Sequence, residues 1–336
     1  MSERISIIGD GAMGTLTAIL LAENGLTVRL WSAFADHAEQ ISAERENKKF
    51  LPGPKLPVSI EVTSDESIAL QDASWAVSAV PTQHVRTVWQ RLKNHCPPDL
   101  PVCSITKGIE NQTLFRPTQI VRDVVDADPD SDRPVAVLSG PCIAPEVGRR
   151  LPATVVVGGS SADLAEQVQQ RFTRPYFRVY TNEDPVGLEL AGATKNVIAI
   201  AAGILDGLDA GNNAKAALVT RGLTEIARLG DSLGAQPDTF PGLAGMGDLV
   251  TTCISPEGRN RSFGEAIGRG RTVQQALEAT HSVVEGVPTT RSVVQLAARQ
   301  GVEMPITQAV FDVLFGGRGP QEAITDLMTR PLKAEA

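Results

Sequence analysis

The chain has 336 residues, which is long for one hydrophobic core and fits two domains of ordinary size. Hydrophobic residues make up 42% and charged residues 21% of the chain, values typical of globular proteins rather than of disordered or fibrous ones. The net charge of -8 and the aromatic content of 4% argue against nucleic-acid binding, which favours basic surfaces and stacking side chains.

The sequence predicts neither export nor a membrane span. Its N-terminus leads directly into a strand-like segment without a signal-peptide pattern, and the longest apolar run, near 197–205, has about half the length that a membrane crossing needs. The cysteines, Cys96, Cys103, Cys142 and Cys253, form no CxxC pair and no Cys/His cluster. We therefore expect a soluble, cytoplasmic protein with reduced thiols and no metal site.

Strand and helix signals alternate through the first half of the chain. A β-branched run at 4–8 is followed by glycines, a helical pattern at 15–24 and a second strand at 26–31. The same patterns predict strands at 58–62, 75–80, 102–105, 135–138, 154–157 and 177–180, and helices at 84–94 and 162–172. This alternation predicts an α/β domain with a mostly parallel sheet covered by helices on both faces.

From about residue 183 the strand signals almost vanish. Helices are predicted at 188–205, 214–233, 272–279, 290–300 and 307–314. We therefore expect an α/β domain at residues 1–184 and an all-helical domain at residues 185–336.

A glycine motif, Gly9-Asp-Gly11-Ala-Met-Gly14, lies between the first strand and the first helix. In a dinucleotide-binding turn the first glycine permits a sharp bend, the second lets backbone approach the pyrophosphate, and the third brings helix against strand. The helix N-terminus then offers N–H groups to the phosphates. A glycine turn that binds nothing is the alternative, which the position of the motif disfavours.

The end of the second strand does not decide between NAD and NADP. An acidic residue there favours NAD, and a nearby arginine favours NADP, but residues 30–34 carry no charge. Asp36 comes too late to contact the ribose, and Ser32 and Arg45 are only weak signs of phosphate tolerance.

Two segments that follow strands could contact a substrate. Lys107 follows the strand at 102–105, and carboxyl ends of parallel strands face the ligand crevice. The turn Gly140-Pro-Cys142 follows the strand at 135–138 and could bring main-chain groups close to a ligand. A solvated surface lysine and an ordinary tight turn are the alternatives.

The helical half carries two further candidates. Lys195 lies in an apolar helix, where desolvation disfavours the ammonium form and suits a lysine for proton transfer; a structural lysine that reaches solvent is the alternative. Glycines surround Asp248 within 242–258, which predicts a close approach of the backbone or at least an unusual loop. Arg259 then offers a planar fork for phosphate oxygens and Asn260 adds donors and an acceptor, unless this is a purely structural connection.

Taken together, these motifs resemble the NAD(P)-dependent glycerol-3-phosphate dehydrogenases of the bacterial type. The matches run in order along nearly the whole chain, at 9–14, 46–52, 106–108, 139–141, 195–200, 211–212, 218–222, 245–249, 259–260 and 284–286. The resemblance implies a Rossmann-like domain, an all-α domain, a substrate between the two, and a homodimer. It also implies reversible hydride transfer between sn-glycerol 3-phosphate and dihydroxyacetone phosphate, with a role in phospholipid synthesis.

The resemblance also implies roles for individual residues. Lys195 is the expected proton donor or acceptor, with Asp248 as the second catalytic residue. The residues expected to line the phosphorylated substrate are Lys107, Gly140, Cys142, Lys195, Asp248, Gly258, Arg259 and Asn260. Those expected to line NAD or NADP are Gly9, Gly11, Ala12, Met13, Gly14, Ala33, Lys107, Ala144, Arg259, Val284 and Glu285.

Three positions depart from the pattern of this family. Cys142 stands where a hydroxyl residue is usual, Gly258 replaces a serine, and Ala33 replaces a basic residue. Two other functions therefore stay open. One is a related dehydrogenase of a hydroxyacid or of ketopantoate, which the Arg259-Asn260 pair disfavours. The other is a dinucleotide sensor without catalysis, which the joint presence of Lys107, Lys195 and Asp248 disfavours.

Overall fold

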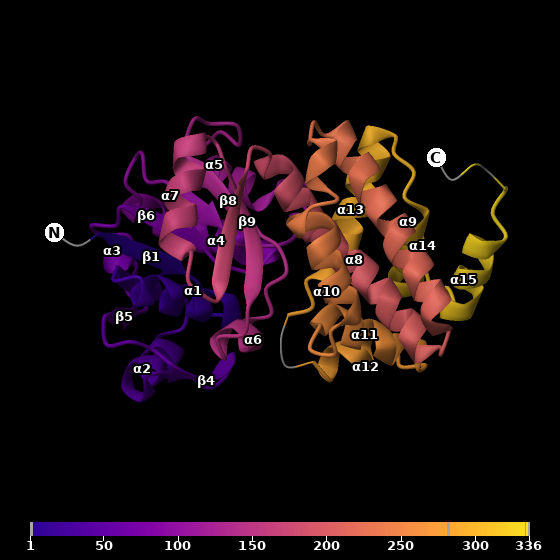
Figure 1. Cartoon of the computed structure of the whole chain (residues 1–336), viewed down its shortest axis with the longest axis horizontal. Helices are drawn as coiled ribbons and strands as arrows, with labels where there is room; N and C mark the ends of the chain where they lie inside the picture. Colours follow the sequence, from indigo (N-terminus) through magenta and orange to yellow (C-terminus); the bar gives the residue numbers. More distant parts are fainter. Residues whose placement is uncertain (1–2, 281–282, 333, 335–336) are drawn as a thin grey trace. The chain divides into compact units, whose positions relative to one another are not determined.

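The computed structural model describes residues 3–280, 283–332 and 334, and it contains two compact units (Figure 1). The first comprises the chain up to Glu110 together with Phe115–Glu189, and the second comprises Asn111–Leu114 together with the chain from Leu190 on. The division thus falls inside a long helix, α8 (Pro185–Gly207). The assignment of separate functions to residues 1–184 and 185–336 stays a prediction.

The first unit is built on an eight-stranded sheet with the order β10-β9-β8-β7-β6-β1-β2-β5. Its strands are β1 (Arg4–Ile8), β2 (Thr27–Trp31), β5 (Ile60–Thr63), β6 (Trp75–Ser78), β7 (Val102–Ser104), β8 (Val135–Ser139), β9 (Ala153–Gly159) and β10 (Phe177–Asn182). Every neighbouring pair is parallel except β8 and β9. The predicted mostly parallel sheet is therefore confirmed, and each predicted strand lies within it.

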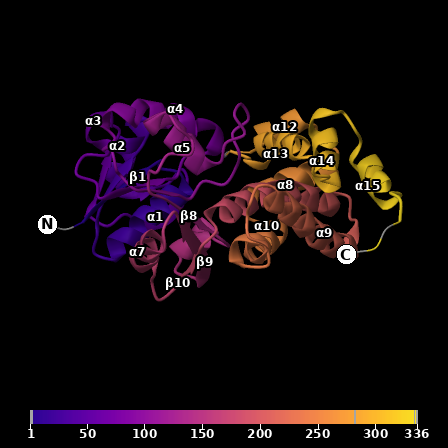
Figure 2. The same cartoon turned by 90° about the horizontal axis from the view of Figure 1, so that it is seen from above.

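Helices cover both faces of this sheet, as the nearly continuous apolar runs of its strands require. One hydrophobic cluster joins the sheet to α1 (Ala12–Glu23) and α7 (Ala162–Phe172), and another joins it to α4 (Thr82–Leu92) and α5 (Pro117–Asp126). Figure 2 shows α4 and α5 on the opposite side of the sheet from α1 and α7.

Several short elements of this unit have no clear sequence signal and were not predicted. They are α2 (Ala35–Glu44), α3 (Glu66–Ala69), α6 (Ala144–Gly148), the 3-10 turn η1 (Lys93–His95), and the hairpin of β3 (Glu46–Asn47) and β4 (Leu51–Lys55). The hairpin matters for the site because its buried Asn47 contacts the glycine-rich turn.

The described part of the second unit is helical throughout, which confirms the predicted all-α half. After α8 it contains α9 (Gly211–Ser232), η2 (Pro237–Thr239), η3 (Leu243–Gly247), α10 (Asp248–Ile254), α11 (Arg259–Gly268), α12 (Val273–Glu278), α13 (Gly286–Gln300), α14 (Pro305–Phe315) and α15 (Pro320–Met328). The close backbone approach expected around Asp248 is confirmed, because a Cβ at Gly245 would lie 2.0 Å from the Phe240 carbonyl oxygen. The segment is not a loop, however: residues 243–247 form a π-helical turn that continues directly into α10.

Helix α8 is the core of this unit. With 23 residues and a mean hydropathy of 1.4 it is long and apolar enough to cross a membrane, but 94% of its apolar window is buried inside the structure, as in the core helix of a globular domain. A Cβ atom at Gly203 would lie 1.9 Å from the Arg261 carbonyl oxygen, and one at Gly264 would lie 2.0 Å from that of Ile200. These glycines therefore let α8 and α11 touch through their backbones, and Asn196 of α8 contacts Asn260 at the start of α11.

Candidate active site

The glycine-rich turn has the geometry that a pyrophosphate needs. Gly9 has a φ of +108°, and a Cβ at Gly14 would lie 1.9 Å from the Gly9 carbonyl oxygen, so both positions exclude a side chain. A Cβ at Gly11 would meet no atom within 4 Å, which leaves open space beside the turn. The first turn of α1 has neither a capping side chain nor an acidic residue, so its N–H groups and positive dipole end can meet an anion. These residues fit a dinucleotide.

The one acidic side chain of this turn is directed to a basic partner. Asp10 Oδ2 lies 2.6 Å from Nδ1 of His37, and both residues are buried. The Asn47 amide donates hydrogen bonds to the Asp10 carbonyl oxygen at 2.7 Å and to Thr15 Oγ1 at 2.8 Å. The hairpin and α2 therefore fix the turn from outside. His37 lies in no recognisable motif, whereas Asn47 lies in the 46–52 segment that carries the family resemblance but had no predicted role.

The structure brings four of the predicted residues of the first unit together in pairs. Lys107 Nζ donates a hydrogen bond of 3.0 Å to the carbonyl oxygen of Gly140, whose φ of +125° holds the turn after β8 in a glycine-favouring conformation. Cys142 Sγ lies 3.8 Å from Met13 Sδ at the start of α1. Thus the turn after β8 contacts both the loop that carries Lys107 and the dinucleotide turn. Ala144 is buried at the start of α6.

In the second unit, Lys195 and Asp248 form a buried ion pair. Lys195 Nζ lies 2.6 Å from Asp248 Oδ1 and 2.6 Å from Thr252 Oγ1, and the two charged residues are 6% and 2% exposed. The Thr252 hydroxyl in turn donates to the Asp248 carbonyl oxygen at 2.6 Å. A buried ammonium with a carboxylate and a hydroxyl is held in one place. The alternative of a solvent-reaching lysine is therefore wrong.

Thr252 was missed from the sequence, although a signal exists. It follows Asp248 by four residues, and positions i and i+4 share one face of a helix. The glycines before Asp248 hide this periodicity, because they are typical of an irregular segment. The π-helical turn before α10 is a feature that often marks functional sites.

Arg259 and Asn260 open α11 and bind the segment that carries Val284 and Glu285. Arg259 Nη1 donates a 3.0 Å hydrogen bond to the Val283 carbonyl oxygen. Asn260 Nδ2 donates to Asn196 Oδ1 at 3.0 Å, and Asn260 Oδ1 accepts from the Gly286 N–H at 2.9 Å. The buried Asn260 thus links α8, α11 and α13, so that predicted substrate and cofactor residues of this unit lie in one network.

The structure also places Gly258 and Ala33, the two other positions that depart from the family pattern. Gly258 precedes α11, and a Cβ there would lie 3.1 Å from both the Ser255 and Thr252 carbonyl oxygens, so this position is tight. Ala33 follows β2, and its carbonyl oxygen lies 3.5 Å from Nη1 of Arg91.

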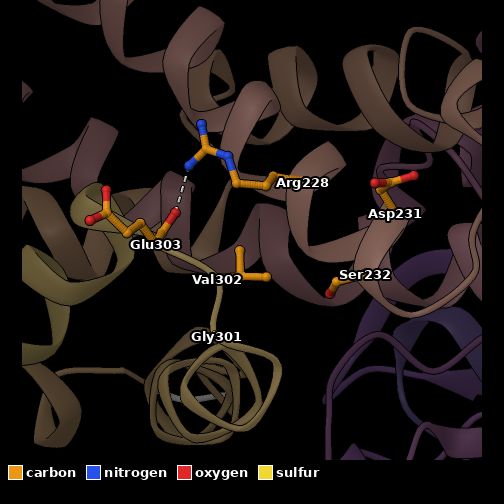
Figure 3. A pocket seen from close by; sticks show the side chains of 6 residues that line it. All are labelled: Arg228, Asp231, Ser232, Gly301, Val302 and Glu303. Atoms are coloured by element: carbon orange, nitrogen blue, oxygen red, sulfur yellow. Dashed lines mark hydrogen bonds between the residues drawn. The ribbon is translucent and has the colours of Figure 1, made fainter. Parts of the chain in front are cut away.

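None of these residues lines the surface hollow shown in Figure 3. It has a volume of about 530 Å³ and is lined by Arg228, Asp231, Ser232, Gly301, Val302 and Glu303. Arg228 Nη1 reaches the backbone oxygen of Glu303 at 2.6 Å.

Two family profiles cover most of the chain. The profile of the NAD-dependent glycerol-3-phosphate dehydrogenase N-terminus matches residues 4–165, and that of the C-terminus matches residues 184–325. The chain belongs to the NAD-dependent glycerol-3-phosphate dehydrogenase family. The resemblance read from the ordered motifs is therefore confirmed.

Individual members of this family are similar over their whole length. The chain is 45% identical over 332 residues to a glycerol-3-phosphate dehydrogenase (NAD(P)+) of Chlorobium phaeobacteroides, covering 99% of both chains. It is 47% identical over 334 residues to that of Geobacillus thermodenitrificans, covering 99% of this chain and 96% of the other. The crystal structure of glycerol-3-phosphate dehydrogenase from Coxiella burnetii is 36% identical and matches with a TM-score of 0.93, covering 98% of this chain and 99% of the other.

Proposed function

We propose that this chain interconverts sn-glycerol 3-phosphate and dihydroxyacetone phosphate with NAD or NADP and so supplies glycerol 3-phosphate for phospholipid synthesis. The observation that carries the proposal is the buried Lys195 ammonium, fixed by Asp248 and Thr252. In a family of glycerol-3-phosphate dehydrogenases, an ammonium held in this way is the natural proton donor for a ketone oxygen.

When bound, the nicotinamide cofactor supplies or accepts the hydride. Lys195 acts at the oxygen of the reacting carbon: its positive charge stabilises the negative charge that develops there, and its Nζ then gives up a proton. In the other direction Nζ takes the proton of the hydroxyl. Asp248 and Thr252 position Nζ, which confines the ammonium to one orientation before substrate binds.

The remaining predicted residues would bind and orient the substrate and the cofactor. Arg259 would contact the substrate phosphate with the side of its guanidinium that Val283 does not use, and Asn260 would hold Arg259 and the 284–285 segment in place. Lys107, Gly140, Cys142 and Gly258 would complete the substrate contacts. The cofactor contacts would come from the dinucleotide turn with Ala12 and Met13, and from the other predicted residues, which are Ala33, Lys107, Ala144, Arg259, Val284 and Glu285.

The test is the oxidation of NADH and NADPH by dihydroxyacetone phosphate, followed by absorbance. We expect turnover with the wild-type protein, a loss of kcat of at least about a hundredfold in Lys195→Ala, and chiefly an increased KM in Arg259→Ala. The reversed kinetic pattern would refute these roles. Turnover only with a hydroxyacid or ketopantoate-type ketone would indicate the related dehydrogenase, and cofactor binding without turnover would indicate a sensor.

We also propose a cytoplasmic homodimer. The family resemblance supports the dimer, and the four cysteines, which form no CxxC pair in the sequence, suit a reducing compartment. Light scattering after gel filtration tests the dimer: a mass near twice 35.6 kDa is expected, and a mass near 35.6 kDa would refute it.

A further inference from the structure

An arginine from a distant helix lies at the carboxyl end of β2. Arg91, in the last turn of α4, has its Nη1 3.5 Å from the Ala33 carbonyl oxygen. Its guanidinium carbon lies 5.0 Å from the ring centre of Trp31, which is fully buried. Its Nε donates a 2.7 Å hydrogen bond to Glu66 at the start of α3. Three separate segments thus fix the orientation of one guanidinium.

This is the place where a dinucleotide fold distinguishes its two cofactors. A carboxylate at the end of β2 bonds the 2′-hydroxyl of NAD, whereas an arginine nearby accommodates the 2′-phosphate of NADP. Residues 31–34 carry no carboxylate, and the Ser32 hydroxyl is buried and accepts a hydrogen bond from the Phe34 N–H. The side chains of the strand end itself therefore offer nothing that would select either cofactor.

We propose that Arg91 binds the 2′-phosphate of NADP(H) and that Glu66 moderates this binding. The Arg91 side chain is 37% exposed. Its Nε is held by Glu66 at 2.7 Å, whereas its Nη1 contacts the Ala33 carbonyl oxygen at the longer distance of 3.5 Å, a contact that a phosphate oxygen would replace. A guanidinium stacked on a buried ring loses little freedom when it accepts a phosphate, and it can donate two parallel hydrogen bonds. The inference rests on the proposed function for the identity of the cofactor class.

Glu66 gives this arrangement a second consequence. Its carboxylate neutralises Arg91 when no 2′-phosphate is present, so the guanidinium is satisfied when NAD binds. The same negative charge opposes a 2′-phosphate and limits the preference for NADP. A protein built in this way accepts both cofactors, and changes at the two positions should alter their ratio in opposite directions.

A purely structural role for this ion pair makes a different prediction. Partly exposed ion pairs contribute little to stability, so loss of a structural pair would leave the affinities for NADH and NADPH equally unchanged. A loss of affinity for NADPH alone, with the affinity for NADH unchanged, cannot arise in that way.

The experiment is a calorimetric titration of the full chain with adenosine 2′,5′-bisphosphate and with 5′-AMP, and a fluorescence titration with NADPH and NADH. In Arg91→Gln we expect the affinity for the two ligands with a 2′-phosphate to fall at least about tenfold, with 5′-AMP and NADH unchanged. Glu66→Gln should raise the affinity for the 2′-phosphate ligands several-fold. Arg178→Gln, which removes a similar arginine–aromatic stack against Tyr180 on β10, should change none of them.

If Arg91→Gln lowers the affinities for NADH and NADPH equally, or lowers neither, the inference is overturned. Its failure is distinct from failure of the proposed function. If the protein turns over dihydroxyacetone phosphate and Arg91→Gln leaves the affinity for NADPH unchanged, only the role of Arg91 is refuted. An Arg91-dependent 2′-phosphate affinity without any turnover would refute the reaction and leave the cofactor site standing.

Discussion

Lys195 Nζ lies 2.6 Å from Oδ1 of Asp248, and the two charged groups are buried together in the helical unit. Burying an ion pair costs desolvation energy that its Coulombic attraction only partly offsets, so a hydrophobic pair would hold these helices together at least as well. The pair is therefore better explained by the chemistry of its ammonium than by its stabilising effect.

The first prediction concerns Thr252, which accepts a hydrogen bond from Lys195. Thr252→Val preserves the shape of the side chain but removes that acceptor, so the ammonium has one restraint fewer. We expect kcat to fall about tenfold with little change in KM for dihydroxyacetone phosphate, as for loss of a hydrogen bond to a charged group. Thr252→Ser, which keeps the hydroxyl, should restore most of kcat; equal losses in both variants would contradict a positioning role.

The sequence alone was sufficient to predict the strands, but it did not predict the environment of Lys195. Strands such as β1 and β8 are rich in β-branched and other apolar residues, so a local pattern defines them. The environment of Lys195 instead depends on Asp248, 53 positions away, and on a π-helical turn whose glycines resemble a loop. Likewise, Arg91 lies beside Ala33 only because α4 packs on Trp31. Such contacts are set by tertiary packing, which local periodicity does not contain.

The second prediction concerns Asn260, which links α8 to α13. Asn260→Ala removes these hydrogen bonds from the side-chain oxygen Oδ1 of Asn196 and from the Gly286 N–H, both of which are buried. We expect the free energy of unfolding to fall by about 1–3 kcal/mol, measured by urea titration. The matched control Asn213→Ala, at an exposed position of α9, should change it by less than about 0.5 kcal/mol. Equal effects would mean that the Asn260 network contributes nothing.

The third prediction concerns the thiols. Burial raises the pKa of Cys103 and of Cys253 to about 12, and it also raises the pKa of Cys96. The thiolate is the reactive form, so iodoacetamide at about pH 8 should modify the half-buried Cys142 first, and Cys103 and Cys253 only after unfolding. Peptide mass spectrometry at increasing times gives the order. Dihydroxyacetone phosphate should slow the reaction of Cys142; native labelling of Cys253 at the same rate would contradict the prediction.

The fourth prediction concerns pH and the pair of Asp126 with the buried Arg133. Partial burial opposes ionisation of Asp126, but hydrogen bonds from Arg133 and Ser131 outweigh it and hold the pKa of this carboxyl below its usual value. Because the pKa is lowered in the folded state, the pair stabilises the protein above the ordinary aspartate pKa of about 4, and this contribution is lost as pH falls through the folded value.

Asp126→Asn should therefore cost about 1–2 kcal/mol at pH 7, since Arg133 loses its hydrogen-bonded carboxylate and keeps its bonds to backbone oxygens, and the difference from wild type should shrink below about pH 4. Urea titrations of both proteins between about pH 3 and pH 7 measure this. A difference that is constant over this range would show that the charge of Asp126 is not its cause.

The last prediction separates folding from binding in the dinucleotide turn. A methyl group at Gly14 would lie 1.9 Å from the Gly9 carbonyl oxygen, so Gly14→Ala must displace α1 from the turn and should lower Tm by several degrees.

A methyl group at Gly11 would meet no atom within 4 Å, so Gly11→Ala should keep the wild-type Tm. The methyl group would nevertheless occupy the open space that the turn presents to the pyrophosphate. We therefore expect a loss of NADH affinity of at least about tenfold, measured by fluorescence titration, without loss of stability. Unchanged affinity in Gly11→Ala would mean that the pyrophosphate does not approach the turn at this residue.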